Sequence, residues 1–197
     1  MPAYTTFEFG FSRDDLHPLF VDAFYAALQV GGVTFDKVFA WGCDEDMTLA
    51  DIVLWNQARL DDNFRLGDDD DISLNYRQIL LKGTGFEECR VFIGNYSEYI
   101  VFFLIVPEHE LDEGSASLSK VNAIIRSVQA ALPVFVIQSY GELEEPNSVV
   151  AIAGGECPMV LHGGFVPTAI YTRCKLTGGS PVEGGYVFAG ATHQTMH

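Results

Sequence analysis

Two residues with reactive side chains lie towards the C-terminal end of the chain. His162 stands between an apolar segment and a Gly-Gly pair, and Cys157 lies five residues before it. An imidazole serves as a general base, and a thiol as a nucleophile, once the fold brings them within hydrogen-bonding distance. A histidine hydrogen-bonded at a sheet edge is the commoner situation, and the G-x-S-x-G motif is absent. The pattern leaves a small hydrolase or transferase that uses His162 in a Gly-rich cleft as an alternative hypothesis.

The remaining motifs do not indicate a metal or a cofactor. Asp68 to Asp71 form an unbroken run of carboxylates, but the ligand spacing, glycine and glutamate of a calcium-binding loop do not follow. The paired cysteine and histidine spacings of a zinc site are absent, as are the glycine motifs that cradle phosphates. We therefore expect no cofactor and no metal, and we assign no catalytic residue.

The charge balance excludes two classes of partner. The 197-residue chain carries 11 basic and 27 acidic side chains, a formal net charge of −16. Such a chain repels the phosphates of nucleic acids and the anionic headgroups of membranes. Its longest apolar run, Ile100 to Val106, has seven residues, whereas a membrane-spanning helix needs about 20. This run is predicted to be a buried strand.

The carboxylates are unevenly distributed along the chain. Residues 1–114 hold 22 of the 27 acidic side chains and 7 of the 11 basic ones. Most of these acids fall in predicted loops or helix caps, where a fold can gather them into a surface that steers a basic protein. Solvated carboxylates that only maintain solubility would give the same pattern. The predicted partner-binding residues, including two aromatic anchors, are Asp44, Glu45, Asp46, Trp55, Asp61, Asp62, Phe64, Asp68, Asp69, Asp70 and Asp71.

Hydrophobic periodicity predicts the elements that must position these residues. Phe7, Phe9 and Phe11 alternate with Glu8, which is typical of a half-buried strand. Acidic capping boxes at Ser12 and Thr48 and apolar stripes at 3.6-residue spacing indicate helices. In order, the sequence predicts a strand at 5–11, a helix from about 17 to 30, a strand at 33–41, a helix at 48–60, an acidic loop at 61–71, strands at 73–82, 88–93 and 99–106 with a hairpin turn at 94–97, and a helix at 117–132.

After Pro133 the sequence changes to short β-like runs separated by Gly-Gly pairs. These runs predict strands at 134–140, 149–153, 158–162, 169–176 and 186–189. The order of elements favours an α+β fold with a mixed or antiparallel sheet, about three helices and a C-terminal third made mostly of short strands. We expect one domain over 1–197, with any sub-division near 114–133.

The cysteines and the N-terminus bear on the compartment. Cys43, Cys89, Cys157 and Cys174 are far apart and form no C-x-x-C pair, which favours reduced thiols over a disulfide framework. The first residues lack the basic region of a signal peptide. Both observations predict a cytoplasmic protein.

Taken as a whole, the sequence favours a binding protein with no enzymatic activity: an immunity-type inhibitor that neutralises a basic effector, such as a nuclease toxin, by masking its site. A mimic that presents carboxylates in place of nucleic-acid phosphates is a special case of this class. Besides the His162 enzyme, one further alternative is an assembly subunit in which Ile100 to Val106 forms a sheet edge that pairs with a second copy.

Overall fold

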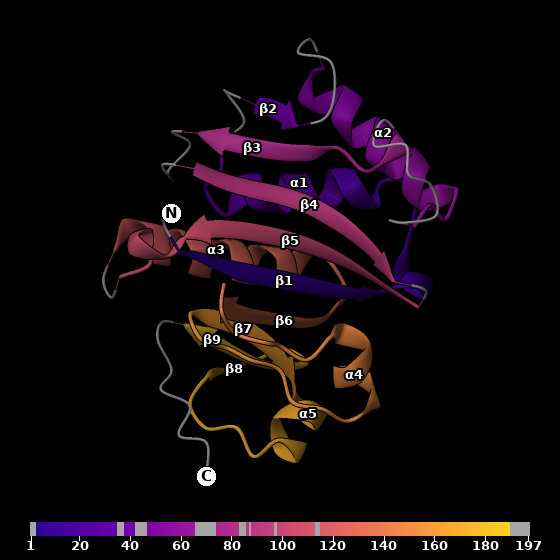
Figure 1. Ribbon diagram of the computed structural model, residues 1–197. Coiled ribbons are helices and arrows are strands. Elements are labelled where there is room, and N and C mark those ends of the chain that lie inside the picture. Colours follow the sequence, from indigo (N-terminus) through magenta and orange to yellow (C-terminus); the bar gives the residue numbers. More distant parts are fainter. Residues whose placement is uncertain are drawn as a thin grey trace.

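A single antiparallel sheet of nine strands forms the centre of the protein (Figure 1). The computed structural model describes residues 3–34, 38–41, 47–65, 74–82, 86, 88–96, 98–112 and 115–189. The spatial order of the strands is β2-β3-β4-β5-β1-β6-β7-β9-β8, so β1 lies in the middle of the sheet. The strands are β1 (Tyr4–Ser12), β2 (Val38–Trp41), β3 (Gln78–Lys82), β4 (Glu88–Tyr96), β5 (Tyr99–Pro107), β6 (Val134–Gly141), β7 (Gly163–Pro167), β8 (Ser180–Val182) and β9 (Gly185–Ala189).

Within the described ranges, three long helices and two short ones accompany the sheet. Figure 1 shows α1 and α3 behind the central strands, α2 beside the β2–β3 end, and α4 and α5 near β6 to β9. The predicted α+β class, with an antiparallel sheet and three substantial helices, is confirmed. The helices are α1 (Phe20–Val30), α2 (Leu49–Asp61), α3 (Ala116–Ala131), α4 (Val149–Gly154) and α5 (Thr168–Arg173), with 3-10 turns η1 (Arg13–Asp15) and η3 (Glu108–Glu110).

The alternation of β1 divides the core into two layers. Phe7, Phe9 and Phe11 are fully buried against α1 and α3, and the Phe11 and Phe20 rings meet edge to face with centroids 5.0 Å apart. Burying each phenylalanine stabilises the fold by roughly 1.5–3 kcal/mol. On the other face, Val149 and Ile152 of α4 and Ile170 of α5 pack with side chains of β5, β6, β7 and β9 in a smaller cluster.

The second face is covered only in part. Strands β3, β4, β5 and β1 turn one side towards α1 and α3. On their other side α4 packs on part of β1 and β5, and no described helix crosses β3 and β4 (Figure 1). Because side chains alternate along a strand, this uncovered side carries Leu80, Phe92, Phe103 and Ile105 together with the exposed Arg90, which lies opposite Leu80 and Ile105. The Phe92 and Phe103 rings stack with centroids 4.4 Å apart. We call this surface the open face.

Local sequence signals predicted the longer helices well. Thr48 and Asp51 form a complete capping box at the start of α2, and Ile52, Val53 and Leu60 are buried as the stripe requires. The predicted helix at 117–132 is α3, whose first turn is capped by the Ser115 hydroxyl. Cap and stripe together fix a helix because both act within a few residues.

The start of the first helix was predicted three residues too early. Ser12 does accept a hydrogen bond from a backbone N–H, that of Asp14 at 3.3 Å, but the turn it caps is η1. Helix α1 begins at Phe20, after Pro18, and its N-cap residue Leu19 makes no side-chain cap. A proline is tolerated only at the first turn of a helix, and here it precedes that turn.

Strand lengths differ from the prediction at two places. The expected strands at 33–41 and 73–82 are shorter in the structure, as β2 and β3. The predicted turn at 94–97 is wrong because β4 continues to Tyr96, which pairs directly with Tyr99. Asn95 is a buried strand residue whose amide donates to the Phe64 carbonyl at 2.7 Å and accepts from Arg13 at 2.6 Å.

The central position of β5 contradicts the hypothesis that Ile100 to Val106 forms an exposed sheet edge. Its residues pair with β4 on one side and with β1 on the other along their length. The run Ile100 to Val106 is continuously apolar because both faces of this strand pack against other parts of the protein over much of its length. It is a buried strand, as expected, and cannot pair with a second copy.

The C-terminal third contains two helices where strands were predicted. The segment 149–153 is helix α4, capped by the Ser148 hydroxyl, which accepts from the Ala151 N–H at 3.2 Å. The segment 169–176 is largely α5, and 158–162 contributes only an isolated bridge between Val160 and Ser139. Runs of five or six apolar residues do not distinguish the two periodicities. Strands β7 and β8 were missed, whereas those predicted at 134–140 and 186–189 are present as β6 and β9.

The expectation of reduced thiols is wrong for two of the four cysteines. Cys157, after α4, is bonded to Cys174, at the end of α5, with Cα atoms 5.7 Å apart. The chain returns through β7 to bring them together, a path that their 17-residue separation does not reveal. Cys89 is buried in the core. None of the helices described between residues 3 and 189 is long and apolar enough to cross a membrane.

Candidate functional site

A carboxylate lies in the middle of the sheet, on the side away from α1 and α3. Glu8 of β1 is opposite Phe103 of β5 and Gln138 of β6, and only 6% of its surface is exposed. A carboxylate in such a position loses most of its hydration, which costs free energy unless polar partners replace the water. Glu8 is therefore the central residue of the candidate site.

Two neutral side chains of β6 supply those partners. The Tyr140 hydroxyl donates to Glu8 Oε2 at 3.0 Å, and Gln138 also hydrogen-bonds to the carboxyl. Burial raises the pKa of Glu8, and these two hydrogen bonds oppose that rise. Burial and the nearby Glu8 charge in turn raise the pKa of Tyr140, which keeps its hydroxyl protonated and able to donate.

Tyr96 closes the pocket from the β4 side because Gly94 leaves room for its ring. A Cβ atom at Gly94 would lie 2.7 Å from Tyr96 Cε2 and 3.1 Å from Phe103 Cε2. The ring therefore folds back along its own strand towards Glu8, and burial together with the nearby Glu8 charge raises the pKa of Tyr96. Tyr96 remains 51% exposed, which places it at the rim of the pocket.

The segment that enters α4 forms the remaining wall. Pro146 to Val150 passes over β1, and Val149 packs on Gly10, where a Cβ would lie 2.8 Å from its Cγ2. The Asn147 carbonyl accepts from Gln138 Nε2 at 2.8 Å, which ties this segment to the hydrogen bonds of Glu8. The pocket so enclosed has a volume of about 280 Å³ and also contacts Val101 and Phe103.

This arrangement suits recognition of a positive charge. Aromatic faces attract cations through their quadrupoles, and a desolvated carboxylate is a strong partner for an ammonium or guanidinium group. Apart from Glu8, the titratable side chains of the pocket are the tyrosines Tyr96 and Tyr140. We call Glu8, Tyr96, Phe103, Tyr140 and the segment Pro146 to Val150 the Glu8 pocket.

Sequence reasoning assigned no function to this site. The alternation of Phe7, Phe9 and Phe11 predicts only that Glu8 lies on the polar side of a half-buried strand. The one sequence feature that could have indicated the site is Gly10. It lies two residues after Glu8 on the same side of the strand, and a residue without a side chain permits another segment to approach the strand closely. The partners Tyr96 and Tyr140 come from strands about 90 and 130 residues away in sequence, so only the strand register identifies them.

Of the predicted partner-binding residues, Trp55 is half-buried and engaged within the protein. Its indole N–H donates to the Asn75 carbonyl at 3.0 Å. The guanidinium carbons of Arg59 and Arg77 lie 4.6 Å and 4.1 Å from its ring centroid. The ring is thus held by cation–π contacts of the chain itself.

The structure brings Asp61, Asp62 and Phe64 together at the C-terminal end of α2. Both carboxylates are exposed, and Asp61 accepts from Gln57 Nε2 at 2.9 Å. Phe64 packs partly against the core and meets the Tyr76 ring edge to face. The other predicted residues, Asp44, Glu45, Asp46 and Asp68 to Asp71, lie outside the described residues.

The environment of His162 does not assemble a nucleophile and base. Its backbone N–H donates to the Ser139 hydroxyl at 2.9 Å, and burial lowers the pKa of its imidazole although Glu108 and Glu144 oppose the shift. Its buried Nδ1 makes no hydrogen bond with the described residues. The thiol of Cys157 is committed to the disulfide. Within the described ranges, no three His, Cys, Asp or Glu side chains are grouped to hold a metal ion.

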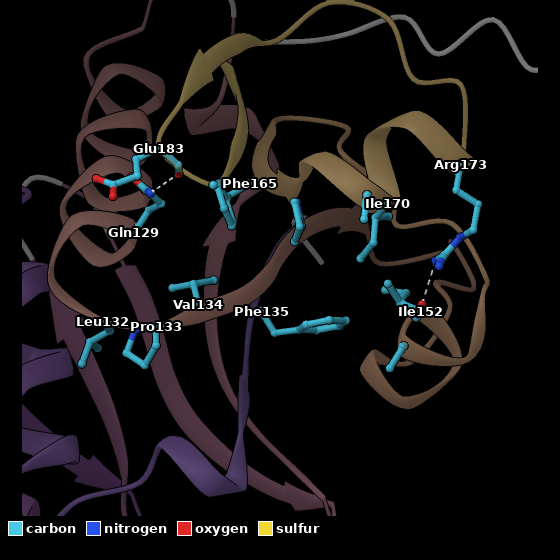
Figure 2. Close-up of a pocket in the computed structure, with 14 residues that line it drawn as sticks. Gln129, Leu132, Pro133, Val134, Phe135, Ile152, Phe165, Ile170, Arg173 and Glu183 are labelled. Atoms are coloured by element: carbon cyan, nitrogen blue, oxygen red, sulfur yellow. Dashed lines mark hydrogen bonds between the residues drawn. The ribbon is translucent and has the colours of Figure 1, made fainter.

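A second pocket opens where β6 and β7 diverge (Figure 2). These strands pair only at Ile137 and Phe165, and the gap beyond has a volume of about 470 Å³. Its walls are mostly apolar, and its polar groups are used internally: Gln129 donates to the Glu183 carbonyl at 3.1 Å and Arg173 donates to the Ile152 carbonyl at 2.9 Å. This second pocket has room for an apolar group, but it presents no reactive side chain.

Comparison with known proteins adds no relative. No protein-family model matches the sequence, and no characterised protein or solved structure matches the chain. The function of the protein is therefore inferred from the site itself.

Proposed function

We propose that this protein is an acidic binding protein that inhibits a basic protein partner, in the manner of an immunity protein that neutralises a toxin such as a nuclease. The observation that carries the proposal is the position of Glu8: a carboxylate at the base of an aromatic pocket, in a chain with a formal net charge of −16. The partner covers the open face and thereby loses access to its own substrate.

The composition of the open face supports a protein partner. Protein interfaces combine an apolar, aromatic centre with a polar rim. Phe92 and Ile105, both partly exposed, provide apolar area beside the Glu8 pocket, and Phe92 stacks on the Phe103 ring that lines the pocket. At the end of the sheet where β5 and β6 stop, the exposed acids Glu108, Glu142, Glu144 and Glu145 supply negative charge. Such charge raises the association rate with a basic protein.

We also propose a cytoplasmic location, and the Cys157–Cys174 disulfide is the observation that opposes it. A reducing cytoplasm keeps thiols such as Cys157 and Cys174 apart. Trapping thiols with a maleimide in intact cells, before lysis, tests this directly: labelled Cys157 and Cys174 agree with a cytoplasmic protein, and a protected pair indicates an oxidising compartment.

The test of function is capture followed by reconstitution. Tagged protein is incubated with lysate of the source cells, bound proteins are eluted along a salt gradient, and each basic candidate is purified. The proposal requires a candidate whose enzymatic or toxic activity falls to zero at a one-to-one ratio, and whose association rate decreases with ionic strength. Neutralising Asp68 to Asp71 together should slow association and flatten that salt dependence.

A matched control distinguishes steering by these acids from a general effect of charge. Asp14, Asp15, Asp22 and Asp51 are four exposed acids at the starts of helices or turns. Their replacement by asparagine changes net charge by the same amount as neutralising Asp68 to Asp71. Equal slowing by both sets would contradict a role for the Asp68 to Asp71 run, and a complete lack of inhibited basic partners would refute the proposed function.

A further inference from the structure

We infer that the Glu8 pocket receives an arginine side chain of the basic partner, which stacks on the tyrosine rings and pairs with the Glu8 carboxylate. This inference rests on the proposed function for the identity of the partner. It adds the recognised chemical group, a guanidinium carried by a protein, and the residues that recognise it.

The hydrogen-bonding environment of Glu8 favours a cation as the occupant. The carboxylate is almost fully buried, and the hydrogen bonds it receives come from the neutral Tyr140 and Gln138. Neutral donors compensate the buried charge less well than a cation does. When ionised, the Glu8 carboxylate presents a negative charge that its neutral partners leave available to a positive group entering from the open face.

The shape and size of the pocket favour a side chain over a free small molecule. Small-molecule sites typically measure roughly 300–1,000 Å³ and enclose most of the ligand. The Glu8 pocket measures about 280 Å³, and Tyr96 at its rim is half exposed. A side chain on a protein surface can enter from that rim while its backbone remains outside.

The planar walls favour arginine over lysine. The rings of Tyr96, Phe103 and Tyr140 line the pocket together with the Asn147 segment. A guanidinium is planar, stacks on aromatic faces and is more weakly hydrated than an ammonium, so its transfer into the pocket costs less. Its several N–H groups can also donate to Glu8 in a forked arrangement.

The direct test uses N-acetyl-arginine amide as the probe and N-acetyl-citrulline amide as its uncharged isostere. Protein labelled at tyrosine is titrated with each, and the ring resonances of Tyr96 and Tyr140 are followed by NMR. We expect saturable shifts with the arginine probe and binding about ten-fold weaker with the citrulline probe. Equal binding of the two probes, or no shift with either, overturns the inference.

Variants locate the binding within the pocket. Glu8→Gln keeps a hydrogen-bonding side chain of the same shape and should weaken the arginine probe about ten-fold. Asp22→Asn removes the same charge from an exposed position on α1, behind the sheet, and should leave binding unchanged. Tyr96→Ala removes a half-exposed ring and should weaken binding several-fold. Unchanged binding in Glu8→Gln that remains folded by circular dichroism overturns the inference.

The two proposals can fail separately. Suppose that the arginine probe binds and that Glu8→Gln abolishes its binding, yet no basic protein is inhibited. The arginine assignment of the pocket is then supported and the proposed function is refuted. If a basic partner is inhibited equally well by wild type and Glu8→Gln, the function stands and the arginine assignment is wrong. Lysine selectivity, tested with N-acetyl-lysine amide, would likewise contradict the guanidinium assignment.

Discussion

Replacing Tyr140 with phenylalanine isolates the hydrogen bond that holds the Glu8 carboxylate. The substitution removes the hydroxyl that donates to Glu8 Oε2 at 3.0 Å and leaves the ring in place. A hydrogen bond to a charged group contributes about 1.5–3 kcal/mol. Because Tyr140 is only half-buried, we expect a loss of about 1.5 kcal/mol in the free energy of unfolding at pH 8.

The loss must depend on the ionisation of Glu8. The Tyr140 hydrogen bond lowers the pKa of Glu8, so its removal moves that pKa further above the ordinary value. The stability lost in Tyr140→Phe should therefore be smallest at acidic pH, where Glu8 is protonated, and grow as pH rises through the raised pKa of Glu8. The titratable side chains that face Glu8 are Tyr96 from β4 and Tyr140 from β6, and both stay neutral over this range.

A double-mutant cycle supplies the assay. Urea unfolding is measured for wild type, Tyr140→Phe, Glu8→Gln and the double variant between pH 4 and 8. In the Glu8→Gln background the hydrogen bond joins two neutral groups and contributes about 0.5–1.5 kcal/mol, so a coupling free energy of about 1 kcal/mol is expected at pH 8. Since the raised pKa of Glu8 costs stability as pH rises, Glu8→Gln should also flatten the decline of stability with pH. Equal, pH-independent losses in both backgrounds would refute the reasoning.

Three further substitutions test other parts of the structure. Gly94→Ala places a methyl group 2.7 Å from the Tyr96 ring, so the ring should swing outward: the arginine probe is expected to bind several-fold more weakly while the urea midpoint changes little, and unaltered probe binding would contradict the packing. Asn56→Ala leaves two buried backbone groups before β3 without partners and should lower the free energy of unfolding by about 2–4 kcal/mol; a change under about 1 kcal/mol would show that the region relaxes. Replacing Cys157 and Cys174 by serine should cost about 3 kcal/mol, and dithiothreitol should destabilise the wild type by as much but leave the variant unaffected.

A helix or strand can be predicted from the sequence when the residues that determine it lie close together in the chain. Helices α2 and α3 were predicted because a cap and an apolar stripe lie within one continuous segment. Helices α4 and α5 were not, because a six-residue helix has fewer than two turns in which a periodicity can be recognised. Their identity is set by packing on the sheet, where Val149 and Ile152 are buried one turn apart.

The Glu8 pocket could not be predicted at all from one sequence. The pocket forms only when β1 is in register with β5 and β6 and when the Tyr96 ring folds back over Gly94. It also needs the segment Pro146 to Val150 to pass across β1. Each is a contact between segments distant in the chain. The charge of the chain, by contrast, is a property of composition, and it indicates the sign of the partner without its docking site.

The central place of β1 has a consequence for the biosynthesis of the protein. Strand β1 leaves the ribosome before its sheet partners β5 and β6, whose residues follow about 100 and 130 positions later. At roughly 5–20 residues per second, β1 waits about 5–25 seconds for the two strands that pair with it. During this interval the backbone edges of β1 are open to chaperones and to other nascent chains, and Glu8 is still hydrated. Folding is therefore expected to begin late and to depend on long-range closure.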